Sequence, residues 1–183
     1  MKNAVVAAIA AAVLTLVAPA VSAAAQADVL RQVQDRDEIE ALMWKYNRAL
    51  DTLNADAYAA VFTPDGAFGD TKGAAALKKM IVDTKKGFDE RTAKGNPPGA
   101  MHHVEMNEHL EFIDRDHARL HYYWMTVFGA VKQGDPARVA AVDHGVDDLV
   151  RVNGKYGWLN NALFISSISA ATGGVTITIY KLG

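Results

Sequence analysis

The sequence of 183 residues contains no cysteine. Disulfide bonds, thiolate catalysis and metal sites with cysteine ligands are therefore excluded. An excess of charge is also lacking, since 19 basic and 21 acidic residues give a formal net charge of −2. That balance offers no electrostatic basis for binding nucleic acid or an anionic membrane surface. Stability must therefore come from an apolar core, and the hydrophobic content of 50% is enough to form one.

Several motifs that carry chemistry are missing as well. No glycine-rich phosphate loop follows a predicted strand, and no serine-nucleophile motif occurs. The histidines show neither the H-x-H nor the H-E-x-x-H spacing that is typical of metal sites. We therefore expect a protein that uses neither a metal nor another cofactor.

The N-terminus carries the only long apolar run, Ala4–Val17, which follows Lys2 and precedes the small residues around Ala23. This order predicts a secretory signal peptide over residues 1–25, cleaved after Ala23 or Ala25. A membrane span needs about 20 residues, so the run is short for an anchor, although a retained anchor or a buried helix is the alternative. We expect export to a bacterial periplasm or medium, no membrane contact after cleavage, and one mature domain over residues 26–183.

Three helices are predicted in the first half of the mature chain. Apolar residues recur at three- and four-residue steps from Ile39 to Leu53, and Asp35 with Glu38 forms a capping box ahead of them. Asn54 predicts the cap of a short helix over residues 55–62, and the segment 63–66 predicts a turn. A third helix is expected over residues 73–94, where Gly95 and the prolines after it end the helical pattern.

Beyond Gly99 the apolar spacing changes from near 3.6 residues to two, which indicates strands. They are expected from His102 to Phe112 and over residues 118–130, 139–152, 155–167 and 175–180, with a hairpin turn at Asn153 and Gly154. The predicted fold class is α+β. Three N-terminal helices pack on a curved antiparallel sheet, which forms a cone with an interior pocket.

Two residues stand where that pocket would be. Asp51 ends the first predicted helix, and His103 lies at the start of the first long strand, on the same face as Glu105, Asn107 and His109. From spacing alone, Asp51 also fits a solvated turn residue and His103 an exposed strand residue. The residues by themselves leave both interpretations open.

The order of the motifs resembles SnoaL-like domains of the nuclear transport factor 2-like superfamily. The resemblance rests on the segments 36–51, 54–58 and 62–66 and on the strand from His103, and it extends over residues 33–164. Enzymes of the scytalone dehydratase and lindane dehydrochlorinase type in this superfamily are built on an Asp–His pair, whose positions correspond to Asp51 and His103. Asn107 matches the dehydrochlorinase strand, and Arg151 falls near an active-site arginine of that enzyme.

The resemblance implies a catalytic set of Asp51, His103 and Arg151. We expect His103 to act as a base, Asp51 to hold its ring, and Arg151, Tyr122 or Trp124 to stabilise developing negative charge. The residues expected to bind substrate are largely apolar and aromatic: Tyr46, Leu50, Phe62, Phe68, Asn107, Tyr122, Trp124 and Phe128.

These expectations favour an exported, cofactor-independent lyase or isomerase acting on a small, mostly apolar substrate. The alternative is a noncatalytic module of the same fold that binds a small ligand. The sequence departs from the family pattern around Trp158, and its end after Phe164 matches nothing in the family.

A homodimer is expected through the sheet. Val104, Met106, Leu110 and Phe112 alternate with His103 and would form an exposed apolar stripe. A bulge near Glu105 would change this alternation.

Overall fold

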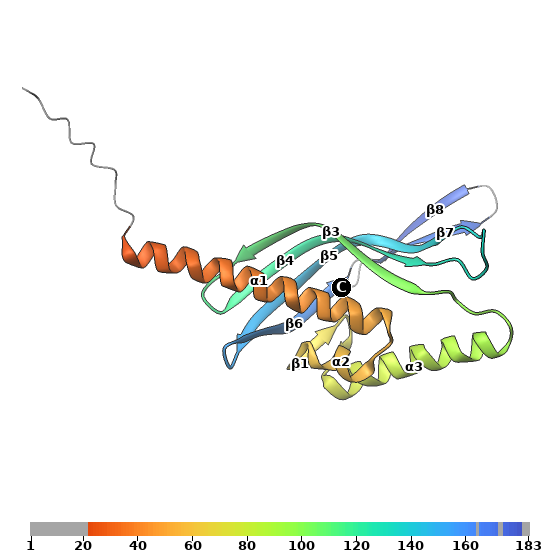
Figure 1. Ribbon diagram of the computed structural model, residues 1–183, viewed down its shortest axis with the longest axis horizontal. Coiled ribbons are helices and arrows are strands. Elements are labelled where there is room, and N and C mark those ends of the chain that lie inside the picture. Colours follow the sequence, from red (N-terminus) through yellow and green to blue (C-terminus); the bar gives the residue numbers. More distant parts are fainter. Residues whose placement is uncertain (1–21, 164, 172–173, 181–183) are drawn as a thin grey trace, which may run out of the picture. The chain divides into compact units, whose positions relative to one another are not determined.

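The computed structural model describes residues 22–163, 165–171 and 174–180, with side chains up to residue 157. The signal-peptide prediction falls largely on residues 1–21, outside the described residues. Figure 1 shows the elements in chain order: α1 (Ala23–Asp51), α2 (Ala55–Ala60), β1 (Phe62–Phe68), β2 (Thr71–Lys72), α3 (Ala74–Ala93), β3 (Met101–Phe112), β4 (His117–Phe128), β5 (Arg138–Val152), β6 (Lys155–Leu163), β7 (Ile165–Ala171) and β8 (Gly174–Tyr180).

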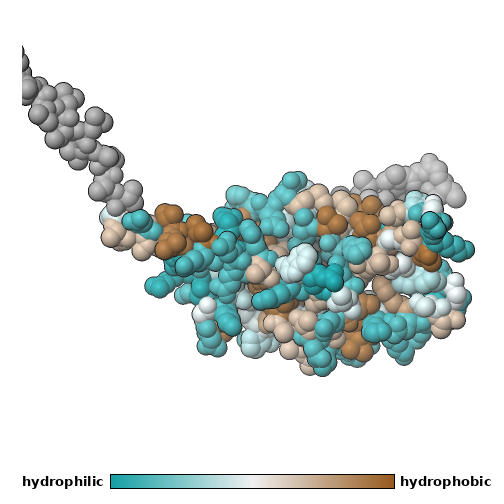
Figure 2. Space-filling view, viewed as in Figure 1, coloured by the Kyte–Doolittle hydropathy of each residue, from teal (hydrophilic) through white to brown (hydrophobic). Residues whose placement is uncertain are grey.

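The chain comprises two compact units, residues 1–34 and residues 35–183, of which the first is described from Ser22. In that unit the start of α1 is stabilised locally: Ser22 accepts a hydrogen bond from the Ala25 N–H at 3.2 Å, and Arg31 pairs with Asp28 at 2.7 Å. Val29 and other apolar side chains here are exposed, and this part of α1 is brown in Figure 2. Among the described residues, no helix is both long and apolar enough to cross a membrane.

The second unit contains a six-stranded sheet in the order β2-β1-β6-β5-β4-β3. Its neighbouring strands run antiparallel except β1 and β6, which are parallel. The α+β prediction of N-terminal helices followed by an antiparallel sheet is confirmed, with β1 and β2 as unexpected additions. β7 and β8 pair with each other in a separate hairpin, so the predicted strand over residues 155–167 is divided and the last strand does not join the main sheet.

One predicted turn and one predicted helix cap are wrong. The segment Thr63–Gly66 lies within β1, and the chain reverses after it, where Gly69 has a φ of +53°. Pro64 is tolerated because β2 pairs only with the far end of β1, which leaves the N-terminal part without a strand on that side. Asp35 does not cap a helix either. It lies inside α1, which begins at Ala23 and is interrupted by no glycine or proline.

The other helix predictions are confirmed closely. The Asn54 side chain accepts a hydrogen bond from the Ala57 N–H at 3.1 Å and caps α2, and α3 begins after Gly73 and ends at Ala93. The predicted apolar faces of α1 and α3 are buried against one face of the sheet and form the core with β4 and β5. The buried core residues of these elements include Ile39, Leu42, Tyr46, Leu77, Ile81, Leu120, Tyr122 and Leu149.

An irregularity in β3 decides which side chains face the core. The register against β4 shifts between Met106 and His109, and Asn107 has a φ of +54°. Before the shift, His103 and Glu105 lie opposite Thr126 and Trp124; after it, the even-numbered residues face inward.

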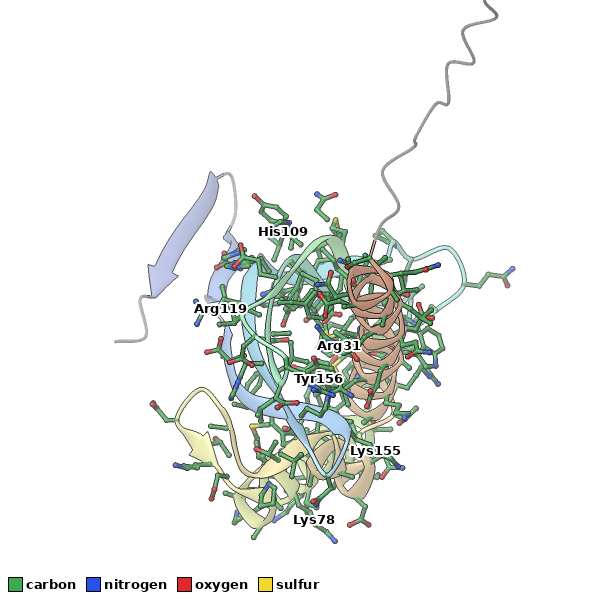
Figure 3. The ribbon with its side chains drawn as sticks, turned by 90° about the vertical axis from the view of Figure 1, so that its left-hand side faces the viewer. Arg31, Lys78, His109, Arg119, Lys155 and Tyr156 are labelled. Atoms are coloured by element: carbon green, nitrogen blue, oxygen red, sulfur yellow. The ribbon has the colours of Figure 1, made fainter. Side chains whose placement is uncertain are left out.

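The predicted apolar stripe is therefore divided by this irregularity. Leu110 and Phe112 pack against the core, whereas Val104 remains 39% exposed on the outer face. The outer face also carries Arg119, which pairs with Asp148 at 2.7 Å; Figure 3 shows Arg119 on the side of the sheet away from α1. The prediction of a continuous stripe of four apolar residues is wrong, because the extra residue in β3 reverses the alternation of the side chains.

Candidate active site

A cavity of about 300 Å³ opens between the helices and the inner face of the sheet. Its wall is apolar except at a few positions on α1, α2, β3 and β4. The lining residues are Tyr46, Leu50, Leu53, Tyr58, Phe68, Met80, Ile81, Thr84, Met101, His103, Glu105, Tyr122, Trp124, Thr126 and Ala141. A hollow of this size suits a small organic molecule with few polar groups.

Asp51 and His103 meet at the edge of this cavity, as the family resemblance implied. Asp51 Oδ1 lies 2.9 Å from the ring Nδ1 of His103 and also accepts the His103 backbone N–H at 2.8 Å. The last turn of α1 supplies the carboxylate and the start of β3 supplies the ring. The double contact fixes both the position and the orientation of the imidazole.

This geometry selects one form of the neutral ring. A carboxylate is an acceptor only, so Nδ1 carries the proton and donates it to Asp51, which leaves the lone pair on Nε2. Within the described residues, Nε2 makes no hydrogen bond, and the imidazole lines the cavity. His103 is thus arranged to accept a proton from a molecule bound there.

Asp51 itself is well enclosed, with a side chain that is 9% exposed. Its second oxygen, Oδ2, lies 3.7 Å from Nη1 of Arg48 and 3.7 Å from Nδ1 of His102. These groups are partly exposed cations or potential cations.

A second carboxyl group, that of Glu105, was not selected from the sequence. It lines the cavity two residues after His103, and its Oε2 accepts a hydrogen bond from Asn47 Nδ2 at 2.9 Å. Burial raises the pKa of Glu105 to about 7, with smaller contributions from the Glu108 and Asp51 carboxylates, while the Asn47 hydrogen bond opposes the shift. The alternation of the strand, which places Glu105 on the face of His103, was the signal that could have found it.

The tyrosines of the cavity wall are buried, as is a third carboxyl group, that of Asp147. Burial raises the pKa of Tyr46, with contributions from nearby tyrosines and carboxyl groups, and burial also raises the pKa of Tyr58, where the hydrogen bond with Tyr46 opposes the shift. Asp147 is fully buried, which raises its pKa well above the ordinary value, and Tyr122 donates to its Oδ1 at 3.4 Å. The Tyr122 ring also depends on Gly145, because a Cβ built there would lie 2.4 Å from a ring carbon.

The structure places five of the eight predicted substrate-binding residues on the cavity wall: Tyr46, Leu50, Phe68, Tyr122 and Trp124. The other three do not line it. Phe62 packs behind Tyr58, with ring centroids 5.1 Å apart, and Phe128 packs against Phe88 at 5.9 Å. Asn107 is exposed at the β3 irregularity, since the backbone there turns its side chain out of the inner face.

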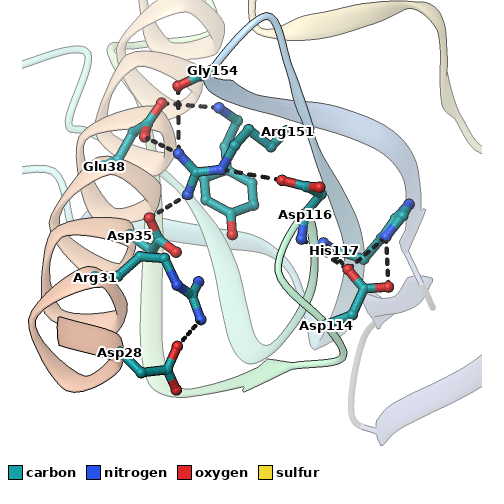
Figure 4. A network of polar contacts seen from close by, with 10 residues as sticks. Asp28, Arg31, Asp35, Glu38, Asp114, Asp116, His117, Arg151 and Gly154 are labelled. Atoms are coloured by element: carbon teal, nitrogen blue, oxygen red, sulfur yellow. Dashed lines mark hydrogen bonds and ion pairs between the residues drawn. The ribbon is translucent and has the colours of Figure 1, made fainter. Parts of the chain in front are cut away.

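Arg151 does not line the cavity, contrary to expectation. Its guanidinium pairs with Asp35, lies 3.7 Å from Glu38 and 3.8 Å from Asp116, and stacks 4.4 Å from the centre of the Tyr156 ring (Figure 4). The two carboxylates of the supposed capping box thus bind the arginine that was assigned to catalysis. The loop spacing near Arg151 differs from the family pattern, and spacing alone could not reveal this partnership.

A second, more polar hollow of about 620 Å³ lies on the other side of the pair, between α1 and β3. We call it the acidic groove. It is lined by Glu40, Met43, Trp44, Asn47, Arg48, Asp51, His102, His103, Val104, Glu105 and Glu108. His103 and Glu105 line both hollows. Among the residues with described side chains, no three potential ligands are grouped so as to hold a metal ion.

Comparison with known proteins identifies the fold and the family. No curated protein matches the chain. Among solved structures, similar folds occur in an NTF2-like protein with a cystatin-like fold from Novosphingobium aromaticivorans (TM-score 0.63, 18% identity, 82% of this chain and 93% of that one) and in a candidate scytalone dehydratase from the same organism (TM-score 0.59, 18% identity, 85% and 93%).

A protein from Catenulispora acidiphila, solved in complex with S-DNPA, is also similar, with a TM-score of 0.55 and 19% identity over 72% of this chain and 92% of that one. Identities this low establish the fold alone. The family model of the SnoaL-like domain matches residues 31–159. Since that match spans most of the sequence, this chain belongs to the SnoaL-like domain family and has its NTF2-like fold.

Proposed function

We propose that this protein is a cofactor-independent lyase or isomerase that acts on a small, mostly apolar substrate. The observation that carries the proposal is the Asp51–His103 pair, joined at 2.9 Å on the wall of an apolar cavity. A base next to such a cavity can remove a proton from a carbon atom beside a carbonyl group. Loss of a leaving group from the neighbouring carbon gives elimination, and return of the proton at another carbon gives isomerisation.

Each member of the pair has a defined task in this reaction. Nε2 of His103 takes the proton, and Asp51 stabilises the imidazolium that results and keeps the ring in one orientation. Tyr46, Tyr58 and Tyr122 line the same cavity, and burial raises the pKa of Tyr46 and of Tyr58 above the ordinary value. They are the donors we expect beside the developing oxyanion, a task that Arg151 is placed too far aside to perform.

Deuterium uptake tests the proposal without knowledge of the natural leaving group. The purified protein is incubated in D₂O with a panel of small apolar ketones and esters, and exchange of the acidic C–H is followed by mass spectrometry. We expect exchange or product formation that is lost in both His103→Ala and Asp51→Asn. Activity that persists in His103→Ala would contradict the proposal, whereas tight binding of panel compounds without any exchange would favour the ligand-binding module.

Two further expectations accompany the proposal. We expect export after cleavage of residues 1–25, which N-terminal sequencing of the protein from its native host would test. We also expect a homodimer through the outer face of the sheet, where Tyr123 is 54% exposed and Val104 39% exposed. Sedimentation of a monomer at micromolar concentration would count against the dimer.

A further inference from the structure

We propose that Glu105 is a second catalytic residue, which gives a proton to the leaving oxygen of the substrate while His103 removes a proton from carbon. This inference rests on the proposed function and makes it narrower. It assigns the cavity to substrates whose leaving group departs as a neutral molecule, such as a hydroxyl group lost as water, rather than as a halide ion.

The placement of the two side chains supports a concerted role. His103 and Glu105 are two residues apart on the inner face of β3, before the irregularity, and both line the cavity. Two residues of a strand span about 7 Å, so the base and the acid flank a space that neighbouring carbon atoms of one small substrate can fill. Side chains on the same face of a strand also approach the substrate from the same side.

Glu105 is held in place but is not neutralised by a cation. Asn47 Nδ2 donates to Oε2 at 2.9 Å, and within the described residues Oε1 makes no hydrogen bond and no cation pairs with the carboxyl group. One oxygen is thus fixed by α1 and the other is left for a ligand. A carboxyl group that served only to hold α1 against β3 would gain more from a charged partner.

The surroundings of Glu105 favour its neutral form. The carboxylates of Asp51 and Glu108 repel a negative charge there, and the buried groups Tyr46 and Asp147 lie on the cavity side. The acidic groove contributes Glu40, and the basic groups that line it, Arg48, His102 and His103, lie beside Asp51. Burial and these charges raise the pKa of Glu105 to about 7, so the proton that it would donate is present in about half of the molecules at neutral pH.

The step balances without any other reagent. The C–H bond breaks and its proton goes to Nε2 of His103, the electron pair forms the C=C bond, and the C–O bond breaks as Glu105 gives its proton to the leaving hydroxyl group, which departs as water. The site is left with an imidazolium and a carboxylate. Since both residues also line the acidic groove, solvent there can return the proton from His103 to Glu105.

A pair of substrates on one carbon skeleton tests this assignment. A β-hydroxy ketone needs a proton on its leaving group, whereas the matching β-chloro ketone does not. We expect Glu105→Gln to lower kcat for water loss by about 10²- to 10⁴-fold and to change chloride loss by less than about threefold, while His103→Ala abolishes both. Glu111→Gln, which removes an exposed carboxylate from the same strand outside both hollows, is the matched control and should change neither.

The pH profile gives a second readout that a merely structural role would not move. Water loss by the wild-type protein should decline as Glu105 ionises above about pH 7, and this decline should be absent for chloride loss. Equal losses for both substrates in Glu105→Gln, or no loss for either, would overturn the inference while the His103 dependence keeps the proposed function. A wild-type protein that transforms neither substrate nor any other panel compound would overturn both together.

Discussion

Two places along α1 hold a basic side chain of the sheet with carboxylates, and they do so in opposite ways. Near Asp35, the guanidinium of Arg151 is surrounded by three carboxylates and covered by the Tyr156 ring. Near Asp51, the His103 imidazole has one carboxylate partner and a cavity on its other side. The first arrangement surrounds its cation with protein groups away from the cavity, and the second leaves a lone pair for a ligand.

This difference separates stability from chemistry within one fold. Arg151 joins β5 to α1 and does not line the cavity, so we expect its contribution to be to the folded state. His103 keeps Nε2 available at the wall of the apolar cavity. We therefore expect proton transfer at His103, whose Nδ1 is paired with Asp51 and whose Nε2 lone pair remains available at the cavity.

The largest expected effect comes from the catalytic pair. His103→Ala should lower turnover by at least about 10³-fold, and Asp51→Asn by about 10²- to 10⁴-fold, because the first removes the base and the second removes the acceptor that selects its tautomer. Steady-state kinetics on any substrate found in the deuterium screen measures both. Thermal melting should show both variants folded. A destabilised His103→Ala would contradict the assignment of His103 to catalysis and Arg151 to stability.

The opposite result is expected for Arg151. Arg151→Met should reduce the free energy of unfolding by about 3 kcal/mol, because Asp35, whose side chain is 4% exposed, would lose its partner in the interior. Urea denaturation measures the loss. Turnover per folded molecule should stay within about threefold of the wild type, and a large drop in kcat at full folding would restore Arg151 to the catalytic set.

The raised pKa of Glu105 makes part of the stability depend on pH. A carboxyl group whose pKa is higher in the folded state than in the unfolded state stabilises the fold below the unfolded value, and that contribution is lost as pH rises towards about 7. Between pH 5 and 8 we expect the wild type to lose about 2 kcal/mol relative to Glu105→Gln. Unfolding curves of the two proteins that stay parallel across this range would show that Glu105 ionises normally.

The smallest effect is expected at Asn47, whose hydrogen bond lowers the pKa of Glu105 against the effect of burial. Asn47→Ala should therefore move the midpoint of the Glu105 titration upward, by less than about one pH unit for a single neutral hydrogen bond. Carbon NMR of labelled glutamate side chains reports it. A downward shift would mean that water entering the acidic groove solvates Glu105 better than Asn47 does.

Much of this arrangement could be predicted from the sequence, because it depends on local patterns. The apolar faces of α1 and α3, the Asn54 cap and the Asn153–Gly154 hairpin are set by spacing and by residues with strong conformational preferences. The meeting of Asp51 with His103 was implied by the family resemblance, whereas their spacing alone left it undecided. The distance of 2.9 Å between Asp51 Oδ1 and His103 Nδ1 confirms that the two residues meet.

The predictions that proved wrong depended on non-local contacts. The extra residue in β3 reversed the alternation after Met106, and the strand's composition left open whether a bulge near Glu105 forms. Asp35 and Glu38 fit a capping box by spacing, but they face Arg151, which is more than 110 residues away in the chain. Glu105 was overlooked because its importance comes from burial, which a single sequence does not report.

The central claim is that Asp51 holds His103 with its proton on Nδ1 and its lone pair on Nε2, facing the cavity. Nitrogen-15 NMR of labelled histidine tests it directly, since the two neutral tautomers have distinct ring-nitrogen shifts. The account predicts the Nδ1–H form for His103 in the wild-type protein and loss of that preference in Asp51→Asn. A neutral ring that carries its proton on Nε2 in the wild type would contradict the account.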